Sequence, residues 1–328
     1  MTATVEVLSA GPLVTVQDRG RPGHLNLGLA RGGAADRRAL DEAAALLGAE
    51  GAVFEVQGNP LRLRATAPTS VALTGAPMRA TGGGRPWRWH AAQVLEAGEV
   101  LDLRPGGAGY SCVQVGAGLG TEVVMGSRAA HVIAGIGRLV AAGDALPFTP
   151  HVAPERALRD LPDRFAGGTL RCVPGPQTRL FAPEEVARFQ ATRFLRDPRG
   201  NRQGVRLAFD GAGFAAGGQL GLLSDFILPG DIQMTGDGVP YILGPECQTT
   251  GGYPRIATVI AADLPRAMQA APGAALRFRM VTVEEARAAR PGPVALAPLV
   301  RDPREVPDLL AKQLVGGVIS ARDPEGGR

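Results

Sequence analysis

The sequence is short of lysine and of aromatic residues. Lys312 is the only lysine among 35 basic residues, so no earlier lysine can form a Schiff base, and its Leu-Ala-Lys-Gln context differs from the Met-Lys-Met of a biotin-carrying loop. Aromatic residues make up 5% of the chain, and the net charge of +4 is spread along it. Nucleic-acid binding needs a concentrated basic stripe with aromatic stacking partners, so we expect none. Any covalent cofactor must be carried by another chain.

Cysteine, histidine and long apolar runs are also scarce. The three cysteines and four histidines are far apart and form neither a Cys-x-x-Cys nor a His-x-x-x-His pair, so we expect no disulfide scaffold and no metal site. The chain has no apolar run of the length that spans a membrane, and its first residues do not resemble a secretory signal. These absences predict a cytoplasmic protein that does not insert into a membrane.

What the chain has in abundance is turn residues. Its 328 residues include 46 glycines and 27 prolines without a fixed period, and 45% of them are hydrophobic. That composition predicts a turn-dense globular protein of about two domains. Apolar or β-branched pieces between the turns predict strands at residues 5–8, 13–17, 54–57, 61–64, 71–74, 100–103, 112–115, 170–173, 205–209, 231–234, 241–243, 256–261 and 276–281.

Few helices are predicted. Asp36 is a good N-cap, apolar residues follow it at helical spacing, and Gly48 is a natural stop. Shorter helices are expected at 183–189, 284–290 and 307–314, with a frayed end at 323–328. Many strands and few helices favour β-barrels. We predict a first domain at 1–150, a linker at 151–168, a second domain at 169–285 and a C-terminal extension at 286–328.

Common nucleotide-binding and hydrolase motifs are missing. Gly116-Ala-Gly118-Leu-Gly120-Thr121 lacks the last glycine of a dinucleotide fingerprint, and the chain has neither a Gly-x-x-x-x-Gly-Lys-[Ser/Thr] loop nor a Gly-x-Ser-x-Gly elbow. If the protein takes part in ATP consumption, another element must contribute the usual phosphate-binding loop.

Two stretches in the first half carry candidate site residues. The segment 11–23 places Asp18 directly before two arginines, Arg19 and Arg21, where the charges can orient an anionic ligand or form a salt-bridged turn. The segment 32–36 brings paired glycines to a helix start, a favourable place for a carboxylate or phosphate, although plain capping explains Asp36 equally well.

Two further stretches lie in the second half. The segment 201–207 includes Arg202, and 246–255 combines an acid, a thiol, an amide and two hydroxyls before a Gly-Gly turn. Such a density of polar groups is unusual in a connector. Cys247 has no histidine near it in sequence, so an inert packed thiol is the simpler interpretation.

These stretches resemble the 5-oxoprolinase C-subunit family, also labelled allophanate hydrolase subunit 2 or biotin-dependent carboxyltransferase. The resemblance covers about residues 5–283 and is carried by Gly-Pro-Leu-Val-Thr-Val-Gln-Asp-x-Gly-Arg-Pro-Gly, by Gly-Ala-Ala-Asp at 33–36 and by Gln-Thr-Thr-Gly-Gly-Tyr-Pro-Arg at 248–255. It implies a mainly β fold of two tandem cyclophilin-like β-barrel domains with few short helices.

The resemblance also implies a function. It indicates one part of a multi-subunit enzyme, whose A and B subunits, the latter Kip inhibitor-like, act with it in the ATP-dependent, magnesium-assisted opening of 5-oxo-L-proline to L-glutamate. Placing residue chemistry on the family's motif positions gives two groups of candidates. The catalytic candidates are Asp18, Asp36 and Glu246; the substrate-binding candidates are Arg21, Arg202, Gln233, Gln248, Thr249, Thr250, Tyr253 and Arg255.

Two alternatives remain open at this point. The chain can be the carboxyltransferase component of a biotin-dependent, urea carboxylase-like system, with biotin on another chain. It can instead be a non-catalytic antagonist of a kinase-inhibitor homologue. Neighbouring genes would distinguish the three.

Overall fold

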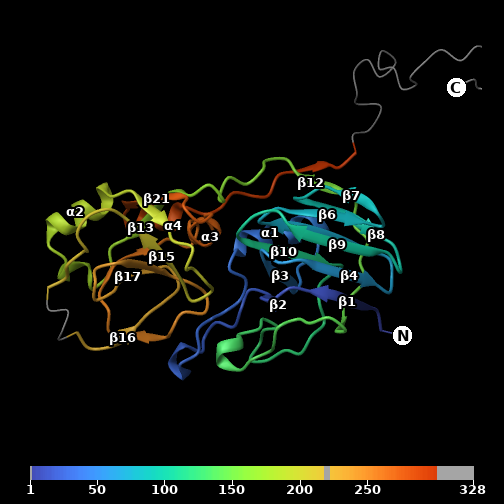
Figure 1. The fold of residues 1–328 in the computed structure, drawn as a ribbon, viewed down its shortest axis with the longest axis horizontal. Helices are drawn as coiled ribbons and strands as arrows, with labels where there is room; N and C mark the ends of the chain where they lie inside the picture. Colours follow the sequence, from blue (N-terminus) through green and yellow to red (C-terminus); the bar gives the residue numbers. More distant parts are fainter. Residues whose placement is uncertain (1, 218–221, 301–328) are drawn as a thin grey trace, which may run out of the picture.

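The computed structural model describes residues 2–217 and 222–300, which form two lobes side by side (Figure 1). The first lobe contains two antiparallel sheets. One has the order β11 (Ala145–Pro147), β1 (Thr4–Ala10), β4 (Leu61–Ala65), β9 (Val100–Pro105), β6 (Met78–Gly82) and β7 (Arg85–Trp87). The other has the order β2 (Val14–Gln17), β3 (Val53–Gln57), β10 (Tyr110–Val115), β5 (Thr69–Gly75), β8 (Ala91–Leu95), β12 (Arg156–Leu158) and β22 (Leu296–Pro298).

The core of the first lobe lies between its two sheets. Strand β4 alternates buried and exposed residues, with Leu61 and Leu63 inward and two arginines outward, as expected for a strand with one wet face. Every residue of β5 is buried, because α1 (Arg37–Leu47) covers its outer face and Thr74 Oγ1 donates to the Ala39 carbonyl at 2.9 Å. The second sheet is therefore a buried layer.

The second lobe is a closed barrel in the order β13 (Gly168–Val173), β20 (Arg255–Val259), β17 (Asp231–Met234), β18 (Pro240–Leu243), β15 (Gly204–Ala208), β14 (Phe194–Arg196) and β21 (Ala275–Met280). The parallel pairing of β13 with β21 closes it. Helix α2 (Pro183–Ala191) inserts Phe189 against Phe278, with ring centroids 4.6 Å apart. Helices α3 (Leu264–Gln269) and α4 (Val283–Ala288) and the small sheet of β16 (Asp225–Phe226) and β19 (Thr250–Gly251) complete this lobe.

The prediction of a mainly β protein with few short helices is confirmed. The helix expected after Asp36 begins at Arg37 and ends at Leu47, with Gly48 in the left-handed region at φ +68°. Helix α3 and several short strands were not predicted. The expected features at 307–314 and 323–328 lie outside the described residues. None of the helices in the described ranges is long and apolar enough to cross a membrane.

The segment after 150 connects the lobes and also returns. Strand β12 lies within 151–168 and pairs with β8, and β22, near the end of the described chain, pairs with β12. Figure 1 shows β22, in red, returning from the second lobe to the first. Both strands thus belong to the second sheet of the first lobe. The chain crosses between the lobes twice, and the crossings hold them together.

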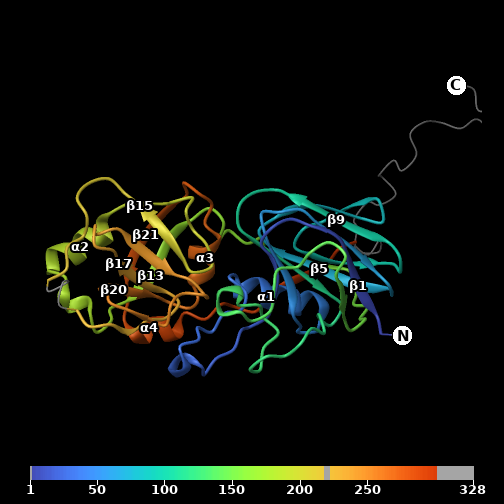
Figure 2. The ribbon, with the colours of Figure 1, turned by 60° about the horizontal axis from the view of Figure 1, so that its bottom comes forward.

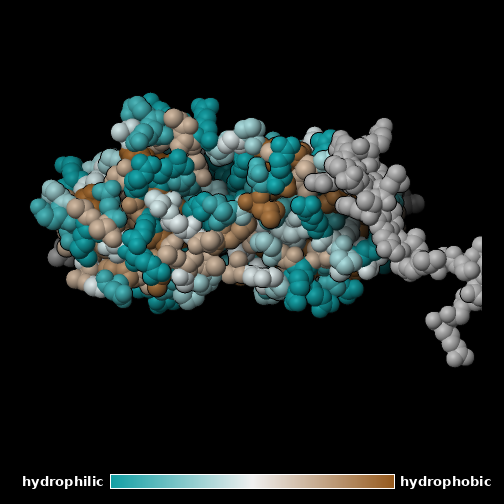
Figure 3. All heavy atoms as spheres, turned by 90° about the horizontal axis from the view of Figure 1, so that it is seen from above, coloured by the Kyte–Doolittle hydropathy of each residue, from teal (hydrophilic) through white to brown (hydrophobic). Residues whose placement is uncertain are grey.

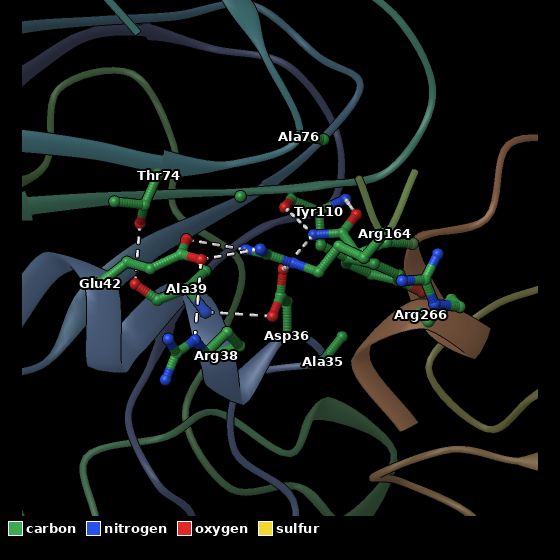
Figure 4. A network of polar contacts seen from close by, with 12 residues as sticks. Ala35, Asp36, Arg38, Ala39, Glu42, Thr74, Ala76, Tyr110, Arg164 and Arg266 are labelled. Carbon is green, nitrogen blue, oxygen red and sulfur yellow. Dashed lines mark hydrogen bonds and ion pairs between the residues drawn. The ribbon is translucent and has the colours of Figure 1, made fainter. Parts of the chain in front are cut away.

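A buried polar network joins the lobes where these crossings meet α1 and α3. Arg164 donates from Nε to Asp36 at 2.6 Å and makes two bonds to Glu42, at 2.7 and 2.8 Å (Figure 4). Gln269 of α3 donates to Asp36 and to the Tyr110 carbonyl, both at 2.7 Å, and its Oε1 accepts from the Tyr110 amide. Arg164 and its two acids are almost fully buried. Along the seam between the lobes, the face seen from above shows both hydrophilic and hydrophobic residues (Figure 3).

We expect Arg164→Met to destabilise the protein by about 3–5 kcal/mol, because it leaves two buried carboxylates without their cation. Arg104→Met removes the same charge at the surface, where the pair with Asp102 is exposed, and should cost at most about 1 kcal/mol. Urea unfolding of both variants beside the parent measures the difference. Equal stability of the two variants would contradict the structural role of Arg164.

A pH-dependent contribution to stability comes from His90, which is buried beside Phe165. Burial lowers the pKa of His90 to about 4, and Arg164 and Arg88 act in the same direction. In the unfolded chain, the histidine has an ordinary pKa near 6.5. Between about pH 6.5 and 4, the histidine is therefore protonated in the unfolded chain and neutral in the folded chain. His90 should reduce stability as the pH falls through this window, by up to about 3 kcal/mol.

His90→Asn removes this titration, and asparagine tolerates the left-handed φ of +58° at this position. The stability of the variant, measured by urea unfolding from pH 7 to 4.5, should fall less steeply than that of the parent. Parallel pH curves for the two proteins would show that His90 does not contribute.

Candidate active site between the two lobes

A pocket of about 320 Å³ opens between the lobes. We call it the interlobe pocket. The first lobe and its loops contribute Leu13, Thr15, Glu55, Gln57, Tyr110, Val132, Ile133 and Leu139, and the second lobe contributes Gly200, Asn201, Arg202, Gln203 and Glu246. The pocket thus combines a charged interior with an apolar rim, as ligand sites commonly do.

Arg202 lies between two carboxylates from different lobes. Its Nε donates to Glu246 at 2.7 Å, its Nη1 pairs with Glu55, and its Nη2 donates to the Gly33 carbonyl at 2.6 Å. Burial opposes the charge on Arg202, but the two carboxylates outweigh it and raise its pKa. Burial raises the pKa of Glu55, an effect that Arg202 partly offsets. The three side chains form one buried ionic unit across the seam.

Local turn chemistry fixes Arg202 and Glu246. Asn201 accepts the Gln203 amide with its side chain at 2.8 Å, an Asx-type turn that presents Arg202 at its tip. The Glu246 amide donates to the Arg202 carbonyl at 3.0 Å. Gly244 permits this close approach, since a Cβ there would lie 2.4 Å from the Arg202 oxygen. The chain after β18 is therefore held against the 201–204 turn by this hydrogen bond and close backbone contact.

Tyr110 is the most unusual residue of the pocket. It begins β10 of the first lobe, yet its ring packs into the hydrophobic core of the second. The residue is 1% exposed, and its hydroxyl is a buried polar atom without a hydrogen-bond partner. Burial raises the pKa of Tyr110, so the phenol stays protonated at neutral pH. Tyr110 lines the pocket, and its buried hydroxyl keeps an unused donor beside it.

The chemistry available here is recognition of a neutral polar group. Glu246 uses only Oε1 in its ion pair, and no hydrogen bond among residues 2–217 and 222–300 engages its second oxygen. The Tyr110 hydroxyl can donate to a carbonyl, and this second carboxylate oxygen can accept from an N–H. A donor and an acceptor in one pocket match the two sides of an amide.

The structure brings together only two of the predicted site residues in this pocket, Arg202 and Glu246. Asp36 lies fully buried in the network around Arg164, where it also caps α1. Asp18 shapes its own turn: it accepts from the Ser127 hydroxyl at 2.6 Å and from two backbone amides. Both acids are engaged inside the protein.

The other predicted residues are spread over the first lobe and one end of the barrel. Arg21 is buried in the first lobe, against the carbonyls of Val124 and Ala129. Arg255 is held by Gln177 and by ion pairs to Asp225 and Asp231. The remaining members of the set lie on β17, on β19 or in the loops next to β19, and they are Gln233, Gln248, Thr249, Thr250 and Tyr253.

The N-terminal loop and the 245–250 region are nevertheless neighbours. The Gly32 amide donates to the Pro245 carbonyl at 3.0 Å, and Thr249 Oγ1 lies 4.0 Å from where a Cβ of Gly28 would be. Between them is a second, mainly apolar pocket of about 170 Å³, lined by Arg21, the 22–31 loop, residues 227–229 and Cys247. Burial raises the pKa of Cys247 to about 12, which favours the interpretation of an inert packed thiol.

Sequence reasoning missed Glu55 and Tyr110. Glu55 lies in Val-Phe-Glu-Val-Gln, where the apolar neighbours predict an ordinary strand, and Tyr110 follows a glycine-rich turn. The sequence offers one signal for Glu55, which is its position among apolar strand residues. A carboxylate buried in a strand requires a partner, so this position indicates an ion pair. Its partner Arg202 is 147 residues away.

The chain has no phosphate-binding loop of the usual kind, and no group of three or more acidic, histidine or cysteine side chains within 2–217 and 222–300 could hold a metal ion. The interlobe pocket instead fits a small polar molecule.

The chain matches known proteins over most of its length. A family model described as "Carboxyltransferase domain, subdomain A and B" matches residues 27–280. The chain is 32% identical to the 5-oxoprolinase C subunit of Escherichia coli K12 over 295 residues, which cover 87% of this chain and 94% of that protein. It is 30% identical to the protein of the same name from Haemophilus influenzae, over 86% of this chain and 93% of that one.

Other relatives are longer proteins. A putative urea carboxylase of Emericella nidulans is 26% identical over 88% of this chain but only 25% of its own length. The solved structure of TTHA0988 has a TM-score of 0.74 and 29% identity, and covers 85% of this chain and 56% of its own. The Kluyveromyces lactis urea carboxylase has a TM-score of 0.79, over 87% of this chain and 28% of its own, and its 22% identity supports the fold alone. The chain therefore belongs to the carboxyltransferase domain family and is a homologue of the 5-oxoprolinase C-subunit proteins.

Proposed function

We propose that this chain is the C subunit of an ATP-dependent 5-oxoprolinase, which opens 5-oxo-L-proline to L-glutamate together with A and B subunits in the cytoplasm. One observation carries the proposal: the match extends over 94% of a protein that is itself named as a single subunit. The match to the putative urea carboxylase covers only a quarter of that protein. The chain thus corresponds in extent to the C subunit.

The interlobe pocket suits a lactam. In the net reaction, the ring C–N bond breaks, and water supplies a hydroxyl group to the carbonyl carbon and a proton to the nitrogen. The Tyr110 hydroxyl, which has no partner in the protein, would donate to the ring carbonyl, where negative charge develops as water adds. Glu246 would accept from the ring N–H and hold it in place. A donor directed at developing charge is an effective form of rate enhancement.

The charges of the pocket also support the proposal that this chain acts with partners. Arg202 is the only cation among its lining residues, and Glu55 and Glu246 already neutralise it. The carboxylate of 5-oxoproline therefore lacks a free counter-charge there, and a partner protein would supply one. The mouth carries exposed apolar side chains, including Leu13 at 53% and Ile133 at 66% exposure, which suit an interface with that partner. One of the two partner proteins would also bind ATP with its magnesium ion, since this chain has no phosphate-binding loop of the usual kind.

The urea carboxylase relatives support one alternative function, that of a carboxyltransferase. A carboxyltransferase would move a carboxyl group from biotin to an amide nitrogen, and the same donor and acceptor pair would hold that amide. Biotin would then be carried by another chain, because Lys312 is the only lysine and lacks the usual sequence around it.

One prediction of the proposed function concerns the complete enzyme. This chain alone should release no glutamate from 5-oxo-L-proline, and addition of the purified A and B subunits with ATP and magnesium should give steady release, measured by coupled glutamate detection. Reactions without ATP and without this chain are the controls. Absence of ATP-dependent release would contradict the proposal. Carboxylation of urea or another amide from carboxybiotin would identify the alternative, whereas binding of the B subunit without turnover of either substrate would indicate a non-catalytic antagonist.

A further prediction of the proposed function concerns Tyr110. Because its hydroxyl has no partner to lose, Tyr110→Phe should keep the unfolding midpoint of the parent while lowering kcat of the assembled complex by about 10²-fold. Tyr241→Phe makes the same change on β18, outside the pocket lining, and should leave kcat unchanged. Parent-like kcat in a folded Tyr110→Phe complex would remove this residue from the site.

A further inference from the structure

The wall of the interlobe pocket carries one strained residue. Leu13 follows Pro12 in the turn that leads into β2, and its backbone lies in the left-handed region at φ +64°. Among residues 2–217 and 222–300, only His90 and Met125 share a positive φ without being glycine. Leucine is unfavourable at such a turn position, where glycine or asparagine is usual, because its Cβ crowds the neighbouring carbonyl. The turn would therefore be more stable with a different residue.

Burial of the side chain does not compensate for this strain. Leu13 is 53% exposed, whereas its neighbour Val14 is fully buried in the core of the first lobe. The surrounding backbone holds the turn in place. The Gly11 amide donates to the Pro60 carbonyl at 2.9 Å, and Val14 is paired with Val56 of β3. Residues that the structure holds in an unfavourable conformation cluster at functional sites, so the position of Leu13 indicates a functional role.

Leu13 belongs to an apolar group at the mouth of the interlobe pocket. We call this group the apolar collar, and its members, each between 41% and 66% exposed, are Leu13, Val132, Ile133 and Leu139. Three of them come from the long loop between β10 and β11, which includes the 3-10 turn η2 (Val132–Ala134) and lies at the seam beside the loop with η1 (Leu25–Leu27) (Figure 2). A backbone bridge from Leu139 to Thr15 fixes this loop next to the start of β2. The collar contains every aliphatic side chain of the pocket lining.

The collar is suited to the apolar edge of a small ring. The N–H and the carbonyl of a five-membered lactam belong to adjacent ring atoms. A ring whose N–H is held by Glu246 and whose carbonyl is held by Tyr110 therefore turns its two methylene groups away from both residues. Contact between these methylenes and aliphatic side chains removes apolar surface from water, which is favourable. A polar ring atom in the same place would lose its water without gaining a partner.

We propose that Leu13 determines the specificity of the interlobe pocket by packing against the ring methylenes of the bound lactam. This inference rests on the proposed function, because it takes 5-oxo-L-proline as that lactam. It adds the residue that selects the substrate and the class of analogue that the pocket rejects. The strained turn serves to hold an aliphatic side chain at the mouth, in contact with the ligand.

Leu13→Asn tests the proposal in the complex assembled with saturating A and B subunits. Asparagine has nearly the shape of leucine and tolerates a positive φ, so the variant keeps the turn and loses the apolar contact. The KM for 5-oxo-L-proline should rise about tenfold with kcat unchanged, since the contact is the same in the ground state and the transition state. Leu27→Asn makes the same change at a leucine that is 68% exposed and outside the pocket lining, and should keep the parent KM. Leu13→Met should restore most of the lost affinity.

A ring analogue measures the selectivity itself. 2-Oxoimidazolidine-4-carboxylate has an N–H where 5-oxo-L-proline has the methylene next to the carbonyl. In calorimetry without ATP, the parent complex should bind this analogue about tenfold or more weakly than 5-oxo-L-proline. The preference should shrink several-fold in Leu13→Asn, because its side chain can pair with the added N–H. A merely structural role of Leu13 would leave the preference unchanged.

Stability provides a measurement that does not depend on turnover. Leu13→Gly should unfold at a urea concentration no lower than the parent, because glycine relieves the left-handed strain. A large loss of stability in both Leu13→Gly and Leu13→Asn would show a structural role and overturn the proposal. Parent-like KM and selectivity in folded Leu13→Asn would also overturn it, and weaker subunit assembly at unchanged KM would assign Leu13 to the partner interface instead. A parent complex that binds 5-oxo-L-proline without opening it contradicts the proposed reaction and leaves the binding comparison decisive, whereas binding of neither ring compound would overturn both.

Discussion

The structure depends on pairing buried guanidinium groups with carboxylates from distant parts of the chain. Arg164 joins α1 to the connecting segment through Asp36 and Glu42, and Arg202 joins the lobes through Glu55 and Glu246. A cation in a low-dielectric seam is costly unless it is paired with good geometry. Each pair therefore fixes the relative position of elements that hydrophobic packing alone would leave free to slide. In the observed arrangement, Arg164 and Arg202 are each satisfied by two carboxylates.

The predicted acidic site residues differ in whether their carboxylate oxygens are already hydrogen-bonded inside the protein. Asp36 looks like a helix cap, and it is one, but its second oxygen is needed by Arg164 and Gln269. Both carboxylate oxygens of Asp18 likewise accept hydrogen bonds within the protein. An acid whose oxygens all accept protein hydrogen bonds cannot easily take part in catalysis. The acid that keeps a free oxygen, Glu246, is the one that faces the interlobe pocket.

Local patterns predicted the elements well and the site only in part. Asp36 and Gly48 fixed the bounds of α1, because caps act through neighbouring backbone groups. The apolar piece between turns at 61–64 located β4 for the same local reason. Arg202 and Glu246 were predicted because they stand in polar stretches beside turns, and both line the interlobe pocket. Glu55 and Tyr110 were missed because each lies in a strand and acquires its role from the other lobe, and no local pattern encodes which distant residue closes over a strand. Arg255 was assigned to the site for its charge, yet Asp225 and Asp231 neutralise it.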